Sequence, residues 1–178
     1  VVQRLIERGE SRQAIDEGRR FYRRQDKQAD AAYLYIHTLE QAGHLVEAVQ
    51  ILRKLMAVEP DRLSHRAYLA ELLYQQSGPD GAEGVLQELL AVEPGYLPGL
   101  YLKAKLLVDS GRLADALVVT DQVLQLYPRD VKTLSLKGDI HRLKREYQAA
   151  VDSYRAAYPR LRGYQIVGHI TDTYLRWK

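Results

Sequence analysis

Apolar residues recur along the chain in blocks with helical spacing, and a short polar or glycine-containing segment separates each block from the next. In one block the apolar residues lie at i, i+4, i+7 and i+8, which is the spacing of one helix face. These residues are Leu100, Ala104, Leu107 and Val108. The next block has similar spacing, begins after Gly111 and ends before Pro128. Glycine readily closes a helix C-terminus and proline cannot continue a helix, so the pattern predicts two helices joined by a tight turn.

The same two-helix pattern returns at a constant interval of 34 residues. Five alanines keep this interval, at Ala14, Ala48, Ala82, Ala116 and Ala150. Three prolines and three glycines keep it as well, at Pro60, Pro94 and Pro128 and at Gly9, Gly43 and Gly111. A fixed period between 20 and 50 residues is typical of stacked repeats rather than of a single globular core. The sequence therefore predicts an all-α array of antiparallel helix pairs, with about ten helices.

Placing the recurrent alanine at position 20 of each repeat sets the expected organisation of a single array. The predicted divisions are a partial repeat at 1–28, full repeats at 29–62, 63–96, 97–130 and 131–164, and a lone first helix at 165–178. Residues 1–8 are then the tail of a first helix, and its partner helix covers about 11–24. Because both ends fall inside a repeat, we expect the chain to be part of a longer array.

These residues resemble a tetratricopeptide-repeat array, whose pattern has large apolar residues at position 4, small residues at 8 and 20, a large residue at 24 and proline at 32. The repeat from 131 supplies Leu134, Gly138, Ala150 and Tyr154, and the repeat from 97 supplies Leu100, Ala104, Ala116 and Pro128. Small residues at 8 and 20 let the two helices of a pair approach closely. Ile36, Arg66 and Pro159 depart from the pattern. The resemblance implies a right-handed α-solenoid, a superhelix with an extended concave surface.

The net charge is +3, but the charged side chains are distributed unevenly along the chain. Residues 1–28 carry eight basic and five acidic side chains, residues 29–130 carry eight and fourteen, and residues 131–178 carry ten and four. The basic C-terminal third beside an acidic middle could meet an acidic partner or another copy of the array, although a solvated surface of uneven charge is the simpler interpretation. The absence of cysteine excludes disulfides and thiolate metal sites.

No constellation of residues predicts catalysis. The five histidines contain no i, i+4 pair that could bind a metal on one helix face. The Gly-Pro-Asp-Gly segment at 78–81 is predicted to be a turn between helices rather than a phosphate loop, and His141 a hydrogen-bonded core histidine. We expect a protein that is not an enzyme and that uses no cofactor and no metal.

In the resembling family the first helices line the concave groove, chiefly through positions 2, 5, 9 and 12. The predicted groove residues are Tyr33, His37, Glu71, Tyr74, Tyr101, Lys105, Asp139, Arg142 and His169. Tyrosine offers both a flat apolar ring and a hydroxyl, which suits recognition. Other tyrosines, namely Tyr22, Tyr154 and Tyr158, are expected to fill space between helices. The chain has no asparagine, so the lysine and asparagine clamp with which family members hold a chaperone C-terminus cannot be built in its usual form.

The sequence favours a non-enzymatic scaffold that binds an extended peptide or a partner surface in this groove. The alternative is a periplasmic scaffold of a bacterial exopolysaccharide export or secretion system, because long arrays resembling this one occur there and tyrosines can stack on sugar rings. The periplasm is favoured over the cytoplasm only under this alternative. The sequence does not otherwise indicate a cellular compartment. No membrane span is expected. Nucleic acid is not a favoured partner, since the arginine-rich run at 19–24 lies at a helix end, where cations meet the helix dipole.

Overall fold

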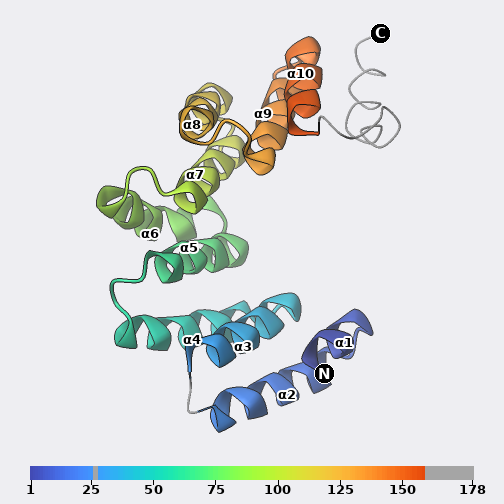
Figure 1. Cartoon of the computed structure of the whole chain (residues 1–178), viewed down its shortest axis with the longest axis vertical. Coiled ribbons are helices and arrows are strands. Elements are labelled where there is room, and N and C mark those ends of the chain that lie inside the picture. The colour runs from blue at the N-terminus through green and yellow to red at the C-terminus, as the bar shows by residue number, and fades with distance from the viewer. Residues whose placement is uncertain (26–27, 159–178) are drawn as a thin grey trace. The chain divides into compact units, whose positions relative to one another are not determined.

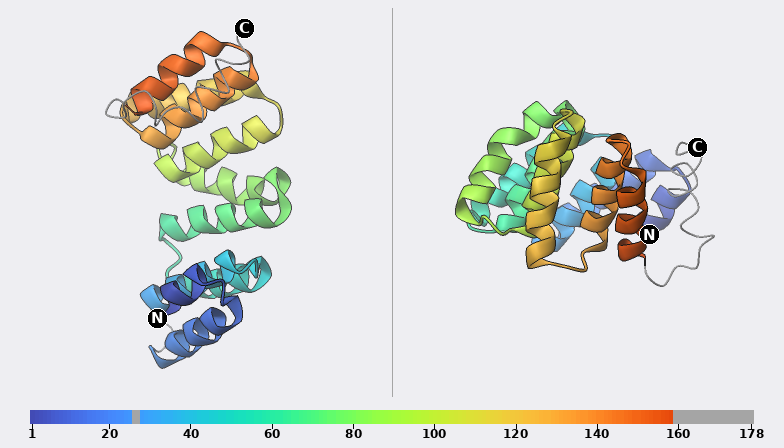
Figure 2. Two further views of the ribbon diagram at one scale, coloured as in Figure 1. Left: turned by 90° about the vertical axis from the view of Figure 1, so that its right-hand side faces the viewer. Right: turned by 90° about the horizontal axis from the view of Figure 1, so that it is seen from above.

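The computed structural model describes residues 1–25 and 28–158, and these residues form ten helices and no strand (Figures 1 and 2). The helices are α1 (Val2–Glu7), α2 (Ser11–Arg24), α3 (Ala29–Gln41), α4 (Leu45–Val58), α5 (Leu63–Ser77), α6 (Pro79–Val92), α7 (Leu97–Asp109), α8 (Leu113–Leu126), α9 (Val131–Leu143) and α10 (Tyr147–Ala157). They belong to two compact units, one from Val1 to Leu89 and one that starts at Leu90. The prediction of an all-α chain of about ten helices is confirmed.

The helices start at a constant interval. The four described first helices after α1 begin at Ala29, Leu63, Leu97 and Val131, and the second helices begin at Ser11, Leu45, Pro79, Leu113 and Tyr147. Each start lies 34 residues after the previous one in its series. Proline follows the ends of α4, α6 and α8 by two residues, as expected of a residue that cannot continue a helix.

The five recurrent alanines all lie on second helices, and none of them exposes any surface to solvent. They are Ala14, Ala48, Ala82, Ala116 and Ala150. A methyl side chain at such a position leaves room for a neighbouring helix, and a larger side chain would have to push that helix away. The prediction that these alanines are buried rather than facing solvent is confirmed.

The turn inside a helix pair depends on one residue with a left-handed backbone. Gly9, Gly43 and Gly111 have φ values of 73°, 77° and 72°, a conformation that glycine adopts without a Cβ penalty. In the pair α5–α6 the left-handed residue is Gly78, one position later, because α5 continues through Ser77. The expected turn over 78–81 is therefore wrong: after Gly78 the chain enters α6 directly. Proline is tolerated at a first helical position, so Pro79 can begin the helix.

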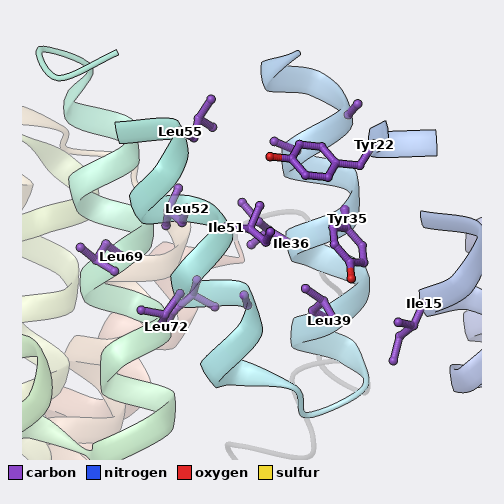
Figure 3. Packing of buried hydrophobic residues seen from close by; sticks show 14 residues of the cluster. Ile15, Tyr22, Tyr35, Ile36, Leu39, Ile51, Leu52, Leu55, Leu69 and Leu72 are labelled. Carbon is purple, nitrogen blue, oxygen red and sulfur yellow. The ribbon is translucent and has the colours of Figure 1, made fainter. Parts of the chain in front are cut away.

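The core of the first unit lies where α2, α3, α4 and α5 meet. Figure 3 shows Ile36 of α3 beside Ile51 of α4. The ring of Tyr35 is 1% exposed and stacks on Tyr22 of α2, with ring centroids 5.7 Å apart. Its hydroxyl accepts a hydrogen bond from Nε of Arg19 at 2.8 Å and donates to Oε1 of Glu47 at 2.5 Å. Buried phenol groups need such partners, and the Tyr35 hydroxyl has both a donor and an acceptor.

In the second unit, α7 and α8 pack through Leu100, Ala104, Val119 and Val123. Helices α9 and α10 lie side by side (Figure 1), and here the small residue is Gly138 on α9. A Cβ atom added to Gly138 would lie 2.4 Å from Cε1 of Tyr154 on α10. The ring of Tyr154 therefore occupies the space that the glycine leaves.

Candidate functional site

The predicted groove residues fall into two sets, one in each unit. Tyr33 and His37 lie on α3, and Glu71 and Tyr74 lie on α5, all in the first unit. Tyr101 and Lys105 lie on α7, and Asp139 and Arg142 lie on α9, all in the second unit. His169 lies outside the described residues. We call the surface formed by Tyr33, His37, Glu40, Tyr68, Glu71, Tyr74 and Gln75 the α3–α5 face.

Tyr33 is half-buried and is held in place from two sides. Its ring stacks on that of Tyr68, with centroids 6.0 Å apart and an angle of 18° between the ring planes. Its Oη atom lies 2.5 Å from Nδ1 of His65, and Nε2 of His65 lies 3.2 Å from Oε2 of Glu59. With Nε2 of His65 donating to Glu59 and Nδ1 accepting from the Tyr33 hydroxyl, the hydrogen bonds of all three groups are satisfied.

His65 is fully buried, and it connects α3, the segment before α5, and α5 itself. The Glu59 carboxylate is also 2.7 Å from Nη1 of Arg62. The hydrogen bond from Arg62 is the main cause of a pKa of Glu59 below its ordinary value, so the carboxylate stays charged beside His65. Tyr33 thus has a structural role in addition to its place on the surface.

Glu40 organises the other end of the α3–α5 face. Its carboxylate accepts hydrogen bonds from Tyr68 Oη at 2.7 Å and from Gln75 Nε2 at 2.7 Å, and Nδ1 of His37 lies 3.5 Å away. Burial raises the pKa of Tyr68, and the hydrogen bond to Glu40 raises it further. The Tyr68 hydroxyl therefore remains a protonated donor.

Three members of this network were missed by the sequence analysis: His65, Tyr68 and Gln75. They lie at positions 3, 6 and 13 of their repeat, beside the positions 2, 5, 9 and 12 on which the groove prediction depended. A usable signal was present, because Tyr68 follows Tyr33 by 35 residues, one more than the repeat length. Such near-register pairs of aromatic residues place their rings on adjacent first helices.

In the second unit, Asp139 and Arg142 are bound within the pair α9–α10. Oδ1 of Asp139 accepts a hydrogen bond from Tyr154 Oη at 2.8 Å and lies 3.6 Å from Nη2 of Arg142. Burial is the main cause of a raised pKa of Tyr154, and the bond to Asp139 adds to it. Hydrogen bonding to Tyr154 is in turn the main cause of a raised pKa of Arg142. Asp139 and Arg142 therefore help to hold the pair α9–α10 together. Both side chains are half-buried, so part of each is still exposed to solvent.

The remaining tyrosine and histidine predictions concern packing. Tyr22 and Tyr154 are buried as expected, and the half-buried Tyr158 accepts a hydrogen bond from Ser135 Oγ at 3.1 Å. His141 is hydrogen-bonded as predicted, with Nδ1 2.7 Å from Oε2 of Glu146, but it is half-buried rather than part of the core. Among the histidines that the structure describes, the fully buried one is His65, which the repeat pattern did not single out.

Residues 1–25 and 28–158 contain no group of three or more histidine, cysteine, aspartate or glutamate side chains arranged to hold a metal ion. Over the same described ranges, no helix combines the length and the apolar character that crossing a bilayer requires.

Known proteins that resemble this chain share its helical-repeat fold. Residues 101–165 match a family model described as tetratricopeptide repeat, and no curated protein matches the chain. Among solved structures, the chain is similar to TTC0263 of Thermus thermophilus, a thermophilic TPR protein, with 19% identity, a TM-score of 0.77, and 98% of this chain and 95% of that chain covered.

Two further solved structures extend the comparison. A tetratricopeptide repeat protein of Parabacteroides merdae is 14% identical, with a TM-score of 0.70 and 99% and 70% of the two chains covered. MamA of Desulfovibrio magneticus RS-1 is 18% identical, with a TM-score of 0.62 and 89% of each chain covered. At these identities the likeness establishes the fold alone. The predicted fold class, a solenoid of antiparallel helix pairs, is confirmed.

Proposed function

Since the chain is a tetratricopeptide-repeat protein, we propose that it is a non-enzymatic scaffold that binds an extended peptide or the surface of a partner protein along its first helices. Stacked helix pairs present repeated surfaces of this kind, each made of side chains from successive first helices. The fold is that of protein-interaction scaffolds, and the binding residues are our proposal.

One observation carries the proposal: half-buried tyrosines recur on the first helices of both units. Tyr33 lies on α3, Tyr74 on α5 and Tyr101 on α7, and charged or polar residues lie near them on the same helices. A half-buried tyrosine has little side-chain entropy left to lose, and it offers both a ring and a hydroxyl to a partner. Binding energy in protein interfaces is concentrated in such aromatic anchors.

The proposal is tested by selecting peptides from a random displayed library on the full chain and measuring their affinities. We expect the double variant Tyr74→Ala/Tyr101→Ala to lose about tenfold in affinity for the selected peptides, because it removes one first-helix anchor from each unit. The matched control is Tyr127→Ala, which removes an exposed tyrosine at the end of α8, away from the first helices. Circular dichroism of each variant checks that the helices remain.

Two results would contradict the proposal. Selected peptides that bind the double variant as tightly as the parent chain would remove the first helices from the binding site. A loss of the same size in Tyr127→Ala would assign the binding to tyrosines in general rather than to this surface. The alternative of exopolysaccharide export stays a prediction, and so does a polysaccharide partner.

A further inference from the structure

We propose that the α3–α5 face recognises a cationic segment of its partner, with an arginine side chain seated against Tyr33 and Tyr68 between the carboxylates of Glu40 and Glu71. The inference rests on the proposed function and adds the chemical class of the ligand. It follows from three features of this face: a fixed pair of aromatic rings, an excess of negative charge, and a carboxylate whose hydrogen-bond donors are uncharged.

The aromatic pair is organised before any ligand arrives. The rings of Tyr33 and Tyr68 are nearly parallel at 18°, and each hydroxyl is tied down, one at His65 Nδ1 and the other at Glu40 Oε2. A ring that is already fixed costs little entropy when it is covered by a ligand. A planar guanidinium group stacks on such rings through cation–π attraction, and arginine does so more often than lysine.

The charge on the two helices that build the face is negative. Together α3 and α5 carry Asp30, Glu40 and Glu71 against one permanently cationic residue, Arg66. Arg66 donates from Nη2 to the carbonyl of Pro60 at 3.1 Å, so its head group is directed to the segment before α5. Arg62, which precedes α5, is paired with Glu59.

The carboxylate of Glu40 is the part of this face that most favours a cation. It is only 15% exposed, and its hydrogen-bond partners are the phenol of Tyr68 and the amide of Gln75, while His37 lies at 3.5 Å. The phenol and amide donors satisfy the oxygen atoms without bringing a positive charge of their own. Glu71 is exposed on the same helix as Tyr68, and its charge is close enough to contribute to the raised pKa of that phenol. A cation at this face would be attracted by both carboxylates, and the partial burial of Glu40 weakens screening of its charge by solvent.

The test uses three labelled peptides of equal length in which serine alternates with arginine, lysine or glutamate, and it measures their binding to the full chain by fluorescence anisotropy. We expect the arginine peptide to bind more tightly than the lysine peptide, and the glutamate peptide to bind at least about tenfold more weakly than the arginine peptide. Glu71→Gln should weaken the arginine peptide roughly threefold to tenfold, because it removes one of two carboxylates near the ligand.

Glu88→Gln is the matched control, since it removes the same charge from an exposed position of α6 in the same unit. Tyr68→Leu should reduce the preference for arginine over lysine. If Tyr68→Leu does not fold, the comparison of Glu71→Gln with Glu88→Gln still tests the inference. Equal losses in Glu71→Gln and Glu88→Gln, or equal binding of the arginine and glutamate peptides, would overturn the inference. If library peptides depend on Tyr74 and Tyr101 while the arginine peptide fails to bind, this inference falls and the proposed scaffold function stands.

Discussion

Arg145 is the one residue other than glycine with a positive φ among residues 1–25 and 28–158. Its φ of 62° lies in the turn between α9 and α10, where the equivalent residues of earlier repeats are Gly43 and Gly111. A side chain in this left-handed conformation brings Cβ close to the carbonyl oxygen and costs about 1–2 kcal/mol. The strain at Arg145 is therefore local to one residue and comes from its Cβ atom.

Replacing Arg145 by glycine is expected to stabilise the chain by about 0.5–1 kcal/mol. Relief of the left-handed strain exceeds the entropy that a new glycine adds to the unfolded state. Chemical denaturation monitored by circular dichroism measures the change in unfolding free energy. Gly111→Ala is the reciprocal control: no atom lies within 4 Å of a Cβ placed there, so its expected loss of about 1 kcal/mol reports the backbone alone. Destabilisation by Arg145→Gly would show that the arginine side chain stabilises the turn.

At the scale of helices, the closeness of a pair is set by one small residue and the ring that faces it. In α9–α10 these are Gly138 and Tyr154, and the ring of Tyr154 is 1% exposed with its hydroxyl fixed on Asp139. The ring cannot swing away without breaking that hydrogen bond. Gly138 is thus required by its neighbour rather than by its own backbone conformation.

Gly138→Ala is expected to destabilise the second unit by about 1–3 kcal/mol, the usual range for overfilling a packed contact. The added methyl group would lie 2.4–2.8 Å from three atoms of the Tyr154 ring. Gly84→Ala in α6 is the control, since a Cβ there meets no atom within 4 Å and helix propensity alone predicts a gain of about 0.5–1 kcal/mol. Thermal melts of both variants compare the two effects. A melt of Gly138→Ala that equals that of the parent chain would show that the ring is not fixed.

At the scale of the whole molecule, stability depends on keeping several phenol groups protonated. Burial is the main cause of a raised pKa for Tyr22, Tyr35, Tyr68 and Tyr154, and for the last three a hydrogen bond to a carboxylate adds to it. These tyrosines are spread over both units, so the effect is not confined to one site. A phenol whose pKa is higher in the folded state binds its proton more tightly there than in the unfolded chain.

The contribution of these phenols to the unfolding free energy is therefore expected to be constant up to about pH 10, the ordinary tyrosine value, and to fall as the pH rises further. Below that pH the phenols are protonated in both states and contribute nothing to the pH dependence. Phenolate absorbance should show some of the thirteen tyrosines ionising near the ordinary value and these four ionising only as the helices unfold. In denaturant all should titrate together. A single ionisation step near pH 10 with intact helical circular dichroism would contradict the prediction.

Much of the fold could be predicted from the sequence because it depends on local properties. Helix starts and ends follow from spacing, glycine and proline, and the register of Ala14 through Ala150 marks the close contacts. The turn at 78–81 was misjudged since a one-residue shift of the left-handed position has no strong local signal when proline and glycine are both present. The place of the candidate residues on first helices was predictable for the same reason.

The partners of those residues were decided only by the tertiary structure. Tyr33 bonds His65, Tyr68 bonds Glu40, and Tyr154 bonds Asp139, which are contacts across 15 to 32 residues of chain. The repeat register determines which side of a helix a residue occupies. It does not determine the neighbours of that residue, because rotating one helix by a single residue brings a different neighbour into contact. The sequence by itself determined that helices pair at a stride of 34 residues and where they touch, because period and side-chain size are local quantities. Packing alone decided which polar groups meet, because hydrogen bonds depend on distances between helices that are set only when the core closes.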